Sequence, residues 1–286
     1  MKFHSLLLLA SLATSLSGGQ AAHRQQLGDE ALAAGLWEIA ASHYEAVLSS
    51  PSLDQSAQAA AILRLAEARL RDGRPSETLE LLEQPAAADH PETSLWKGLA
   101  MAAIGKTAEA ITILTPLTAD PLLPFHADAV FTIANLQLAQ GDEAAALQTL
   151  ELLIDTDDSA LASKARLCEV EVWLDAGRIS EARAALPAAT SVSQQDAPLQ
   201  VFLEAMILLR EKRAADAAAL FRSLIERPQG QSAERYHLAA AGLAEALLAA
   251  GEANEAAVFI ISFLQDYPSS PRLDELFHVL QQAAAR

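Results

Sequence analysis

Residues 243–268 read LAEALLAAGEANEAAVFIISFLQDYP, and this stretch decides the fold. A small residue, Ala244, lies seven positions before Gly251, and Ala256 lies five positions after it. Four positions further on is the large residue Ile260. The intervening residues are mostly good helix formers, and a glycine between two such runs ends a helix in the left-handed conformation. The stretch therefore predicts two short helices joined by a tight turn.

The same order of small residue, turn, alanine and large residue recurs along the chain, which is typical of a repeat protein. Successive turns are 38, 32, 36, 36, 35 and 39 residues apart. The turn positions are Gly35, Gly73, Gly105, Gly141, Gly177, Lys212 and Gly251. The large residues are Tyr44, Leu82, Leu114, Leu150, Leu186, Phe221 and Ile260, and Pro51, Pro187, Pro228 and Pro268 close four of the units.

Three units depart from this order. The second unit has Thr78 in place of the alanine, the fifth has Val170 at the small position, and the sixth has Lys212 at the turn. The order still has a physical reason, because two helices of a hairpin approach closely only where the residues at their crossing are small. Each hairpin then has an apolar face that only its neighbour can cover.

The pattern resembles the tetratricopeptide repeat family over about residues 22–270. That family's tryptophan is missing from its usual place, since Trp37, Trp96 and Trp173 lie elsewhere. The resemblance implies stacked helical hairpins whose first helices line a concave groove that binds proteins. The pairs that carry it are Leu27-Gly28, Leu65-Ala66, Ile133-Ala134 and Leu243-Ala244 on first helices, with Ala40 and Tyr44, and Ala217 and Phe221, on second helices.

We therefore expect an all-α fold, a right-handed α-solenoid of about seven such hairpins in a single domain over residues 22–286. The spacing of Leu273, Leu276, Phe277 and Leu280 predicts an amphipathic C-terminal capping helix. Another helical solenoid or a plain helical bundle is the alternative. The repeats are expected at about residues 22–54, 57–88, 91–124, 126–158, 160–192, 197–229 and 232–269, and the cap at 270–285.

The N-terminus has the features of a secretory signal peptide, residues 1–21. A short positive segment with Lys2 precedes an apolar run from Leu6 to Leu16, and Gly19 and Ala21 fit the small positions before a cleavage site. A buried N-terminal helix is the alternative. No cysteine follows the run, so a lipoprotein is not expected. We predict export to the periplasm or cell envelope, with no transmembrane span, because the run is shorter than the roughly 20 residues required.

The composition limits the classes of partner. The chain has 20 Lys+Arg against 37 Asp+Glu, a formal net charge of −17. This balance argues against nucleic acid, which needs clustered cations, and favours basic partners. Cys168 is the only cysteine, which excludes an intramolecular disulfide and metal sites built on paired cysteines. We interpret it as a small apolar helix residue.

No catalytic, cofactor or metal site is predicted. Residues 104–107, IGKT, resemble the end of a phosphate-binding loop, but Ala100 stands where that motif needs glycine. Asp155 to Asp158 begin like a calcium loop but lack its glycine and final glutamate, so we interpret them as helix-capping residues. The histidines form no helix-face pair at metal-binding spacing. We therefore expect a protein that is not an enzyme and holds no cofactor.

The resemblance assigns a partner-binding groove to positions one after, and three before, the small residue of each first helix. These positions mix acidic with apolar residues, so basic or apolar segments of a partner fit best. We expect a scaffold or adaptor of the cell envelope. A self-assembling structural subunit and, less favoured, a helical envelope hydrolase are the alternatives. The selected groove residues are Asp29, Leu63, Glu67, Leu99, Phe131, Asn135, Glu171, Phe202, Met206 and Glu245.

Overall fold

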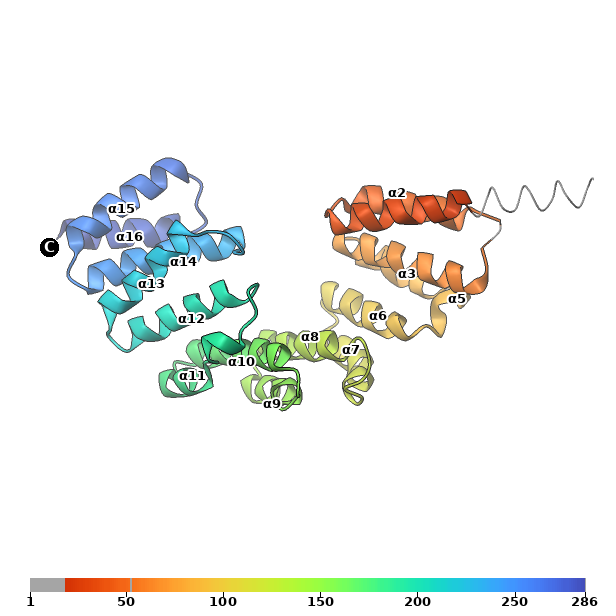
Figure 1. Cartoon of the computed structure of the whole chain (residues 1–286), viewed down its shortest axis with the longest axis horizontal. Coiled ribbons are helices and arrows are strands. Elements are labelled where there is room, and N and C mark those ends of the chain that lie inside the picture. Colours follow the sequence, from red (N-terminus) through yellow and green to blue (C-terminus); the bar gives the residue numbers. More distant parts are fainter. Residues whose placement is uncertain (1–18, 52, 286) are drawn as a thin grey trace, which may run out of the picture. The chain divides into compact units, whose positions relative to one another are not determined.

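A computed structural model describes residues 19–51 and 53–285 of the chain. These residues form helices joined by turns and short connections, without any strand (Figure 1). The predicted α-solenoid is confirmed. Most of the expected signal peptide, residues 1–18, lies outside the described part, and residues 19–33 are helical. Contacts within the chain group into two compact units, Met1–Gln140 and Gly141–Arg286, and the single domain expected over residues 22–286 stays a prediction.

In the first unit, each helix packs against its neighbours in the sequence. The helix at residues 19–33 is followed by α2, which packs against α3, and α3 packs against α4. Further on, α4 contacts α6, and α6 forms a hairpin with α7. The elements after residue 33 are α2 (Trp37–Leu48), α3 (Gln55–Arg71), α4 (Pro75–Leu82), α5 (Pro85–Ala88), α6 (Pro91–Ala103), α7 (Thr107–Leu114), the 3-10 helix η1 (Thr115–Thr118) and α8 (His126–Ala139).

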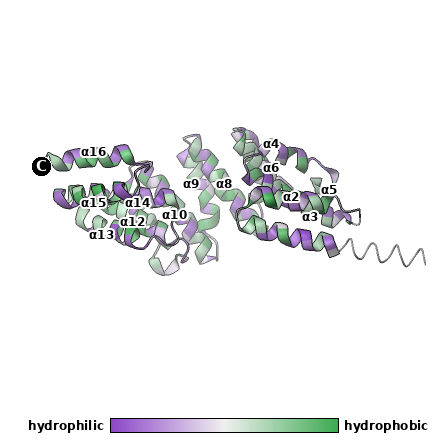
Figure 2. Cartoon of the chain, turned by 90° about the horizontal axis from the view of Figure 1, so that it is seen from above, coloured by the Kyte–Doolittle hydropathy of each residue, from purple (hydrophilic) through white to green (hydrophobic). Residues whose placement is uncertain are grey.

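The second unit repeats this arrangement up to its last helix. α12 packs against α13, α13 against α14, and α14 against α15, while α16 packs against both α15 and α14. Figure 2 shows that its helices carry both hydrophobic and hydrophilic residues, as amphipathic helices do. The elements are α9 (Glu143–Ile154), α10 (Ser159–Asp175), α11 (Ile179–Ala185), the 3-10 helix η2 (Ala189–Ser191), α12 (Ala197–Arg210), α13 (Ala214–Glu226), α14 (Ala233–Ala249), α15 (Ala253–Asp266) and α16 (Leu273–Ala284).

The turns between paired helices have the predicted left-handed residue. The φ of Gly251 is 87°, and two hydrogen bonds close the end of α14, from Gly251 N to Leu248 O at 3.2 Å and from Glu252 N to Leu247 O at 2.9 Å. This is the Schellman arrangement that ends many helices at glycine. Lys212 occupies the same position in the sixth hairpin, with a φ of 64°. The turn assignment that lacked a glycine is therefore confirmed.

Small residues lie where two helices of a hairpin meet, as expected. A Cβ placed on Gly98 in α6 would lie 2.4 Å from the Cγ of Leu114 in α7, far inside van der Waals contact. Likewise, a Cβ on Gly28 would lie 2.9 Å from the ring of Tyr44. Leu114 and Tyr44 are fully buried. The large residue of the second helix thus fills space that the small residue of the first leaves open.

One departure in the sequence, Thr78, and one helix end that the repeat did not predict, at Leu186, have visible explanations. Thr78, in place of alanine, is buried, and its hydroxyl donates to the carbonyl oxygens of Ala66 at 3.1 Å and Arg74 at 3.2 Å. In the fifth hairpin, α11 ends at Ala185, and Leu186 is extended and half-buried rather than helical. Pro187 causes this, because a proline disfavours helical conformation in the residue before it.

Candidate protein-binding surfaces

Two of the selected acidic residues line a hollow of about 500 Å³ in the first unit. Asp29 comes from the helix at residues 19–33, and Glu67 comes from α3. We call this the N-terminal hollow. Its lining residues are Asp29, Leu32, Ala33, Trp37, Arg64, Glu67 and Arg71.

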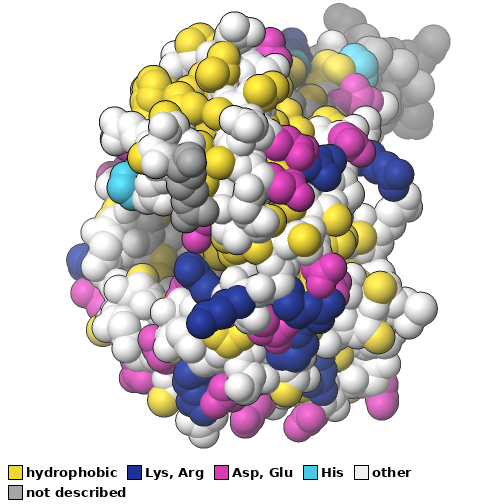
Figure 3. Space-filling model, turned by 90° about the vertical axis from the view of Figure 1, so that its left-hand side faces the viewer, with side chains coloured by type: hydrophobic (Ala, Val, Ile, Leu, Met, Phe, Trp, Pro, Cys, Tyr) yellow, Lys and Arg dark blue, Asp and Glu magenta, His cyan; other side chains and the backbone are white. Residues whose placement is uncertain are grey.

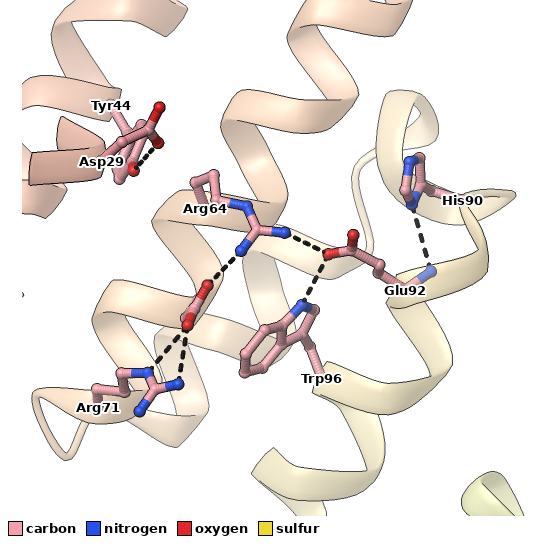
Figure 4. Close-up of polar contacts among 8 residues, drawn as sticks. Asp29, Tyr44, Arg64, Arg71, His90, Glu92 and Trp96 are labelled. Atoms are coloured by element: carbon pink, nitrogen blue, oxygen red, sulfur yellow. Dashed lines mark hydrogen bonds and ion pairs between the residues drawn. The ribbon is translucent and has the colours of Figure 1, made fainter. Parts of the chain in front are cut away.

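Glu67 is not an open acidic group, contrary to the role selected for it. Only 5% of the residue is exposed, and its carboxylate forms ion pairs with Arg64 and Arg71. Arg64 also pairs with Glu92 at 2.7 Å, and the Trp96 indole donates to the same carboxylate at 3.4 Å (Figure 4). A nearly buried carboxylate needs such partners. This part of the expected acidic groove is therefore an internally neutralised network.

Asp29 also has a structural partner. The Tyr44 hydroxyl donates to Asp29 Oδ1 at 2.7 Å (Figure 4), and burial together with this acceptor raises the pKa of the Tyr44 phenol above its ordinary value. The Asp29 residue itself is exposed. Asp29 thus links the helix at residues 19–33 to Tyr44 of α2 and also lines the hollow.

The apolar residues selected in the first unit differ in accessibility. Leu63 is 1% exposed and packs with Leu82 and Trp96, so its side chain belongs to the core and is not open to a partner in this structure. Leu99 is half-buried between two core clusters. On α8, Phe131 is half-buried and Asn135 is exposed, and neither lines the N-terminal hollow.

In the second unit, Glu171 is exposed on α10. Crowding by surrounding protein raises the pKa of its carboxyl, and the Arg235 guanidinium partly opposes this rise. The same crowding, with Glu171 nearby, raises the pKa of the Cys168 thiol to about 11. Cys168 is half-buried, which fits its interpretation as an ordinary helix residue.

The remaining three selected residues, Phe202, Met206 and Glu245, come together in a hollow of about 520 Å³ between α12, α14 and α16. We call it the C-terminal groove. Its floor is mostly apolar, and its charged residues lie on all three helices. It is lined by Phe202, Met206 and Arg210 from α12, by Leu238, Ala241, Gly242, Glu245 and Leu248 from α14, and by Glu275, His278, Val279 and Gln282 from α16.

Aromatic packing holds one wall of this groove in place. The Phe202 ring meets the Phe221 ring edge-on, with centroids 5.9 Å apart. Phe221 in turn fills the space beside Gly242, where an added Cβ would lie 2.6 Å from its Cζ. Phe202 can therefore line the groove with one face while its other side packs in the core.

Sequence reasoning missed the contribution of α16, which we had interpreted only as a cap. A signal was present, because Leu238, Ala241, Glu245 and Leu248 recur at helical spacing on α14, and α16 repeats that spacing. Its Glu275 is paired with Arg272 at 2.9 Å, whereas Glu245 forms no ion pair among residues 19–51 and 53–285. Glu245 is thus the acidic residue of the groove that has no ion-pair partner in the described part of the chain.

Other polar clusters are structural. Ser270 Oγ lies 3.1 Å from His237 Nδ1, but Ser270 is buried and its oxygen also accepts the Arg272 amide at 3.2 Å, as in a turn cap. Lys106, in the phosphate-loop-like segment, instead pairs with Glu109 at 3.2 Å. Over the described residues, no three His, Cys, Asp or Glu side chains form a metal site. None of the helices there has the length and apolar character needed to cross a bilayer.

Comparison with known proteins gives a consistent result. The tetratricopeptide repeat family profile matches residues 95–160 and 173–233. A tetratricopeptide repeat protein from Parabacteroides merdae is 14% identical, with a TM-score of 0.60 over 93% of this chain and 99% of that one. The APC/C hetero-tetramer Cut9-Hcn1 gives 15% identity and a TM-score of 0.54, over 90% of this chain and 51% of that one. These likenesses concern the fold. Among functionally curated proteins, none matches the chain.

Proposed function

Because the chain belongs to the tetratricopeptide repeat family, we propose that it is a non-enzymatic scaffold or adaptor of the bacterial cell envelope. Proteins of this repeat family bind other proteins or peptides. In this chain, the C-terminal groove is the surface that receives the partner. The observation that carries the proposal is a mostly apolar hollow lined by α12, α14 and α16, with the Glu245 carboxylate at its side, which forms no ion pair within residues 19–51 and 53–285.

The groove defines the chemistry of the partner. Phe202, Met206 and Leu238 offer apolar surface on which an apolar side chain or the apolar face of a helix would lie. Glu245 would attract a basic residue next to it. The formal charge of −17 would also attract a basic partner during the encounter. We therefore infer that the preferred ligand is an apolar segment flanked by Lys or Arg.

The cell-envelope part of the proposal rests on the N-terminal sequence. Cleavage after Ala21 would leave Ala22 as the first residue of the exported protein. N-terminal sequencing of the protein recovered from the envelope fraction tests this directly. Recovery of the uncleaved chain from the cytoplasm would contradict export while leaving the groove untouched.

The binding part is tested by site-specific photo-crosslinking. A photo-reactive amino acid at Met206 should capture a partner from envelope extract, and one at Leu152 should not, because Leu152 is 48% exposed on α9, away from the groove. Glu245→Lys should reduce capture, whereas Glu151→Lys on α9 should leave it unchanged. Equal capture from both positions, or insensitivity to Glu245→Lys, would reject the groove as the binding site.

A further inference from the structure

The C-terminal groove changes in chemistry from one helix to the next. α14 lies between α12 and α16 and packs against both (Figure 1). On the α12 side, the apolar side chains of Phe202 and Met206 line the groove, and on α14 the Glu245 carboxylate does so. On the α16 side, His278 and Gln282 are hydrogen-bonded to each other, with their Nε2 atoms 2.7 Å apart. The lining therefore changes from mostly apolar over α12, through an acidic position on α14, to mostly polar over α16.

The repeat places these side chains in rows that cross the three helices. Glu245 lies 39 positions after Met206, and Ala241 lies 39 positions after Phe202. Four lining residues of α16 lie 37 positions after lining residues of α14, so that Gln282 continues the row of Glu245. Residues that share a repeat position face the same direction in stacked repeats. A ligand that lies along this row thus meets Met206, Glu245 and Gln282 in turn.

The size of the groove favours an extended ligand over a helical one. Packed helices are about 8–10 Å apart, so a ligand that reaches from α12 to α16 spans about 16–20 Å. An α-helix of that length, roughly 10 Å wide with its side chains, would occupy more than about 1,200 Å³. The groove has only about 520 Å³. Its floor at Ala241 and Gly242 has almost no side chain, which lets an extended backbone approach closely.

The separation of the rows matches the period of a polyproline II helix. That conformation has three residues per turn, so every third side chain lies on the same side, about 9 Å further along. A β-strand instead repeats on one face after about 6.6 Å, which is shorter than the distance between packed helices. We propose that the groove binds a polyproline II segment with an apolar residue over α12, a Lys or Arg over α14 and a polar residue over α16, each three residues apart. This inference rests on the proposed function, in which the groove receives the partner, and it specifies the sequence of that partner.

The charges of the groove direct the basic residue to α14. Glu245 forms no ion pair within residues 19–51 and 53–285, whereas Glu275 is paired with Arg272 at 2.9 Å. Arg210 lies four positions after Met206 on α12 and lines the groove there. Its guanidinium would repel a Lys or Arg of the ligand at that side. The basic residue therefore lies against Glu245, and the apolar residue lies over α12.

A second apolar surface lies outside the groove and competes for an apolar ligand. Figure 3 views the molecule from the side where α15 and α16 lie and shows hydrophobic side chains gathered in the upper part of that face. On α15, Val258 is 69% exposed, and Ile261 is exposed as well. Neither residue lines the groove. A substitution at Val258 therefore distinguishes binding at α15 from binding in the groove.

Fluorescence anisotropy of the full chain with labelled proline-rich nonapeptides tests the inference. The matched peptide has Leu, Arg and Gln at its second, fifth and eighth positions and proline elsewhere, and its reversed sequence is measured beside it. In the shifted peptide, Arg exchanges places with the proline before it, so that composition and charge stay the same. We expect the shifted peptide to bind about tenfold more weakly, because its Arg no longer faces Glu245. Glu245→Gln should weaken the matched peptide about tenfold and leave the shifted peptide unchanged.

Two control variants and the remaining outcomes complete the test. Glu151→Gln on α9 removes the same charge outside the groove and should leave both affinities unchanged. Val258→Asp should also have no effect, and a loss of binding there would place the peptide on α15 and overturn the inference. Equal binding of the matched and shifted peptides would overturn the three-residue spacing.

Failure of this inference can be told apart from failure of the proposed function. If neither direction of the matched peptide binds while the photo-reactive residue at Met206 still captures a partner, the polyproline II inference is wrong and the groove remains the binding site. If Met206 captures nothing either, both are wrong.

Discussion

The close approach of α6 and α7 makes Gly98→Ala a sensitive test of the packing. An added Cβ would lie 2.4 Å from Cγ and 2.5 Å from Cδ2 of Leu114, a fully buried side chain. Alanine favours helix over glycine by about 1 kcal/mol. Overpacking a core costs roughly 1–3 kcal/mol, and contacts this short with the branch point of a leucine favour the upper half of that range. We expect a net loss of about 1–2 kcal/mol in the free energy of unfolding.

Urea unfolding followed by circular dichroism measures this loss, and a double-mutant cycle identifies its source. Leu114→Ala alone should cost about 2–5 kcal/mol through the cavity it leaves. In that background Gly98→Ala should no longer destabilise, because its methyl group enters the space that Leu114 has left. If Gly98→Ala raises stability in the natural chain, or costs the same in both backgrounds, the close contact with Leu114 is not the determining interaction.

Three further predictions concern single side chains. Lys212→Gly should raise the free energy of unfolding by about 0.5–1 kcal/mol, since its φ of 64° suits glycine, measured by urea unfolding. Tyr44→Phe should lower it by about 1 kcal/mol through loss of the hydrogen bond to Asp29, measured in the same way. Iodoacetamide should modify native Cys168 slowly at pH 8, with a rate that rises towards pH 11, because burial raises the pKa of the thiol to about 11.

Each of these has a result that would contradict it. A Lys212→Gly variant less stable than the natural chain would show that the lysine side chain contributes more than its backbone strain costs. Unchanged stability of Tyr44→Phe would mean that water replaces the hydrogen bond without loss. A rate of Cys168 modification by iodoacetamide that levels off near pH 9 would show an ordinary, solvated thiol.

The raised pKa of the Cys168 thiol also affects stability. Because the unfolded chain loses this proton at a lower pH than the folded chain, the free energy of unfolding should be unaffected by Cys168 below pH 9 and should fall as the pH rises towards 11.

The turns were predictable from sequence because their cause is local. A left-handed residue between two helical runs ends the first helix whatever its surroundings are, so even the lysine at position 212 could be placed by period alone. Helix ends that depend on a neighbouring proline, as at Leu186, were less well defined. Here the repeat predicted a helical residue and the local chemistry of Pro187 prevented it.

The binding residues were harder to predict, because accessibility depends on the neighbouring helix. Leu63 and Phe202 hold the same place in the repeat, yet Leu63 is covered by Trp96 while Phe202 lies beside the small residues Ala241 and Gly242. The ion pairs of Glu67 could have been predicted from the sequence, since Arg64 and Arg71 lie three and four positions away on the same helix. Repeat register gives the direction of a side chain, but the next helix decides whether it is covered.

The contact between Phe221 and Gly242 has a consequence for how this protein could diversify. Any side chain at position 242 would collide with Phe221, so that point of the groove floor must stay bare while the fold is kept. Leu238 and Glu245 line the groove without a comparable constraint, whereas Met206 also packs against the core. A designer who wishes to redirect the groove to a new ligand should randomise Leu238 and Glu245 and hold Gly242, Phe202 and Phe221 fixed.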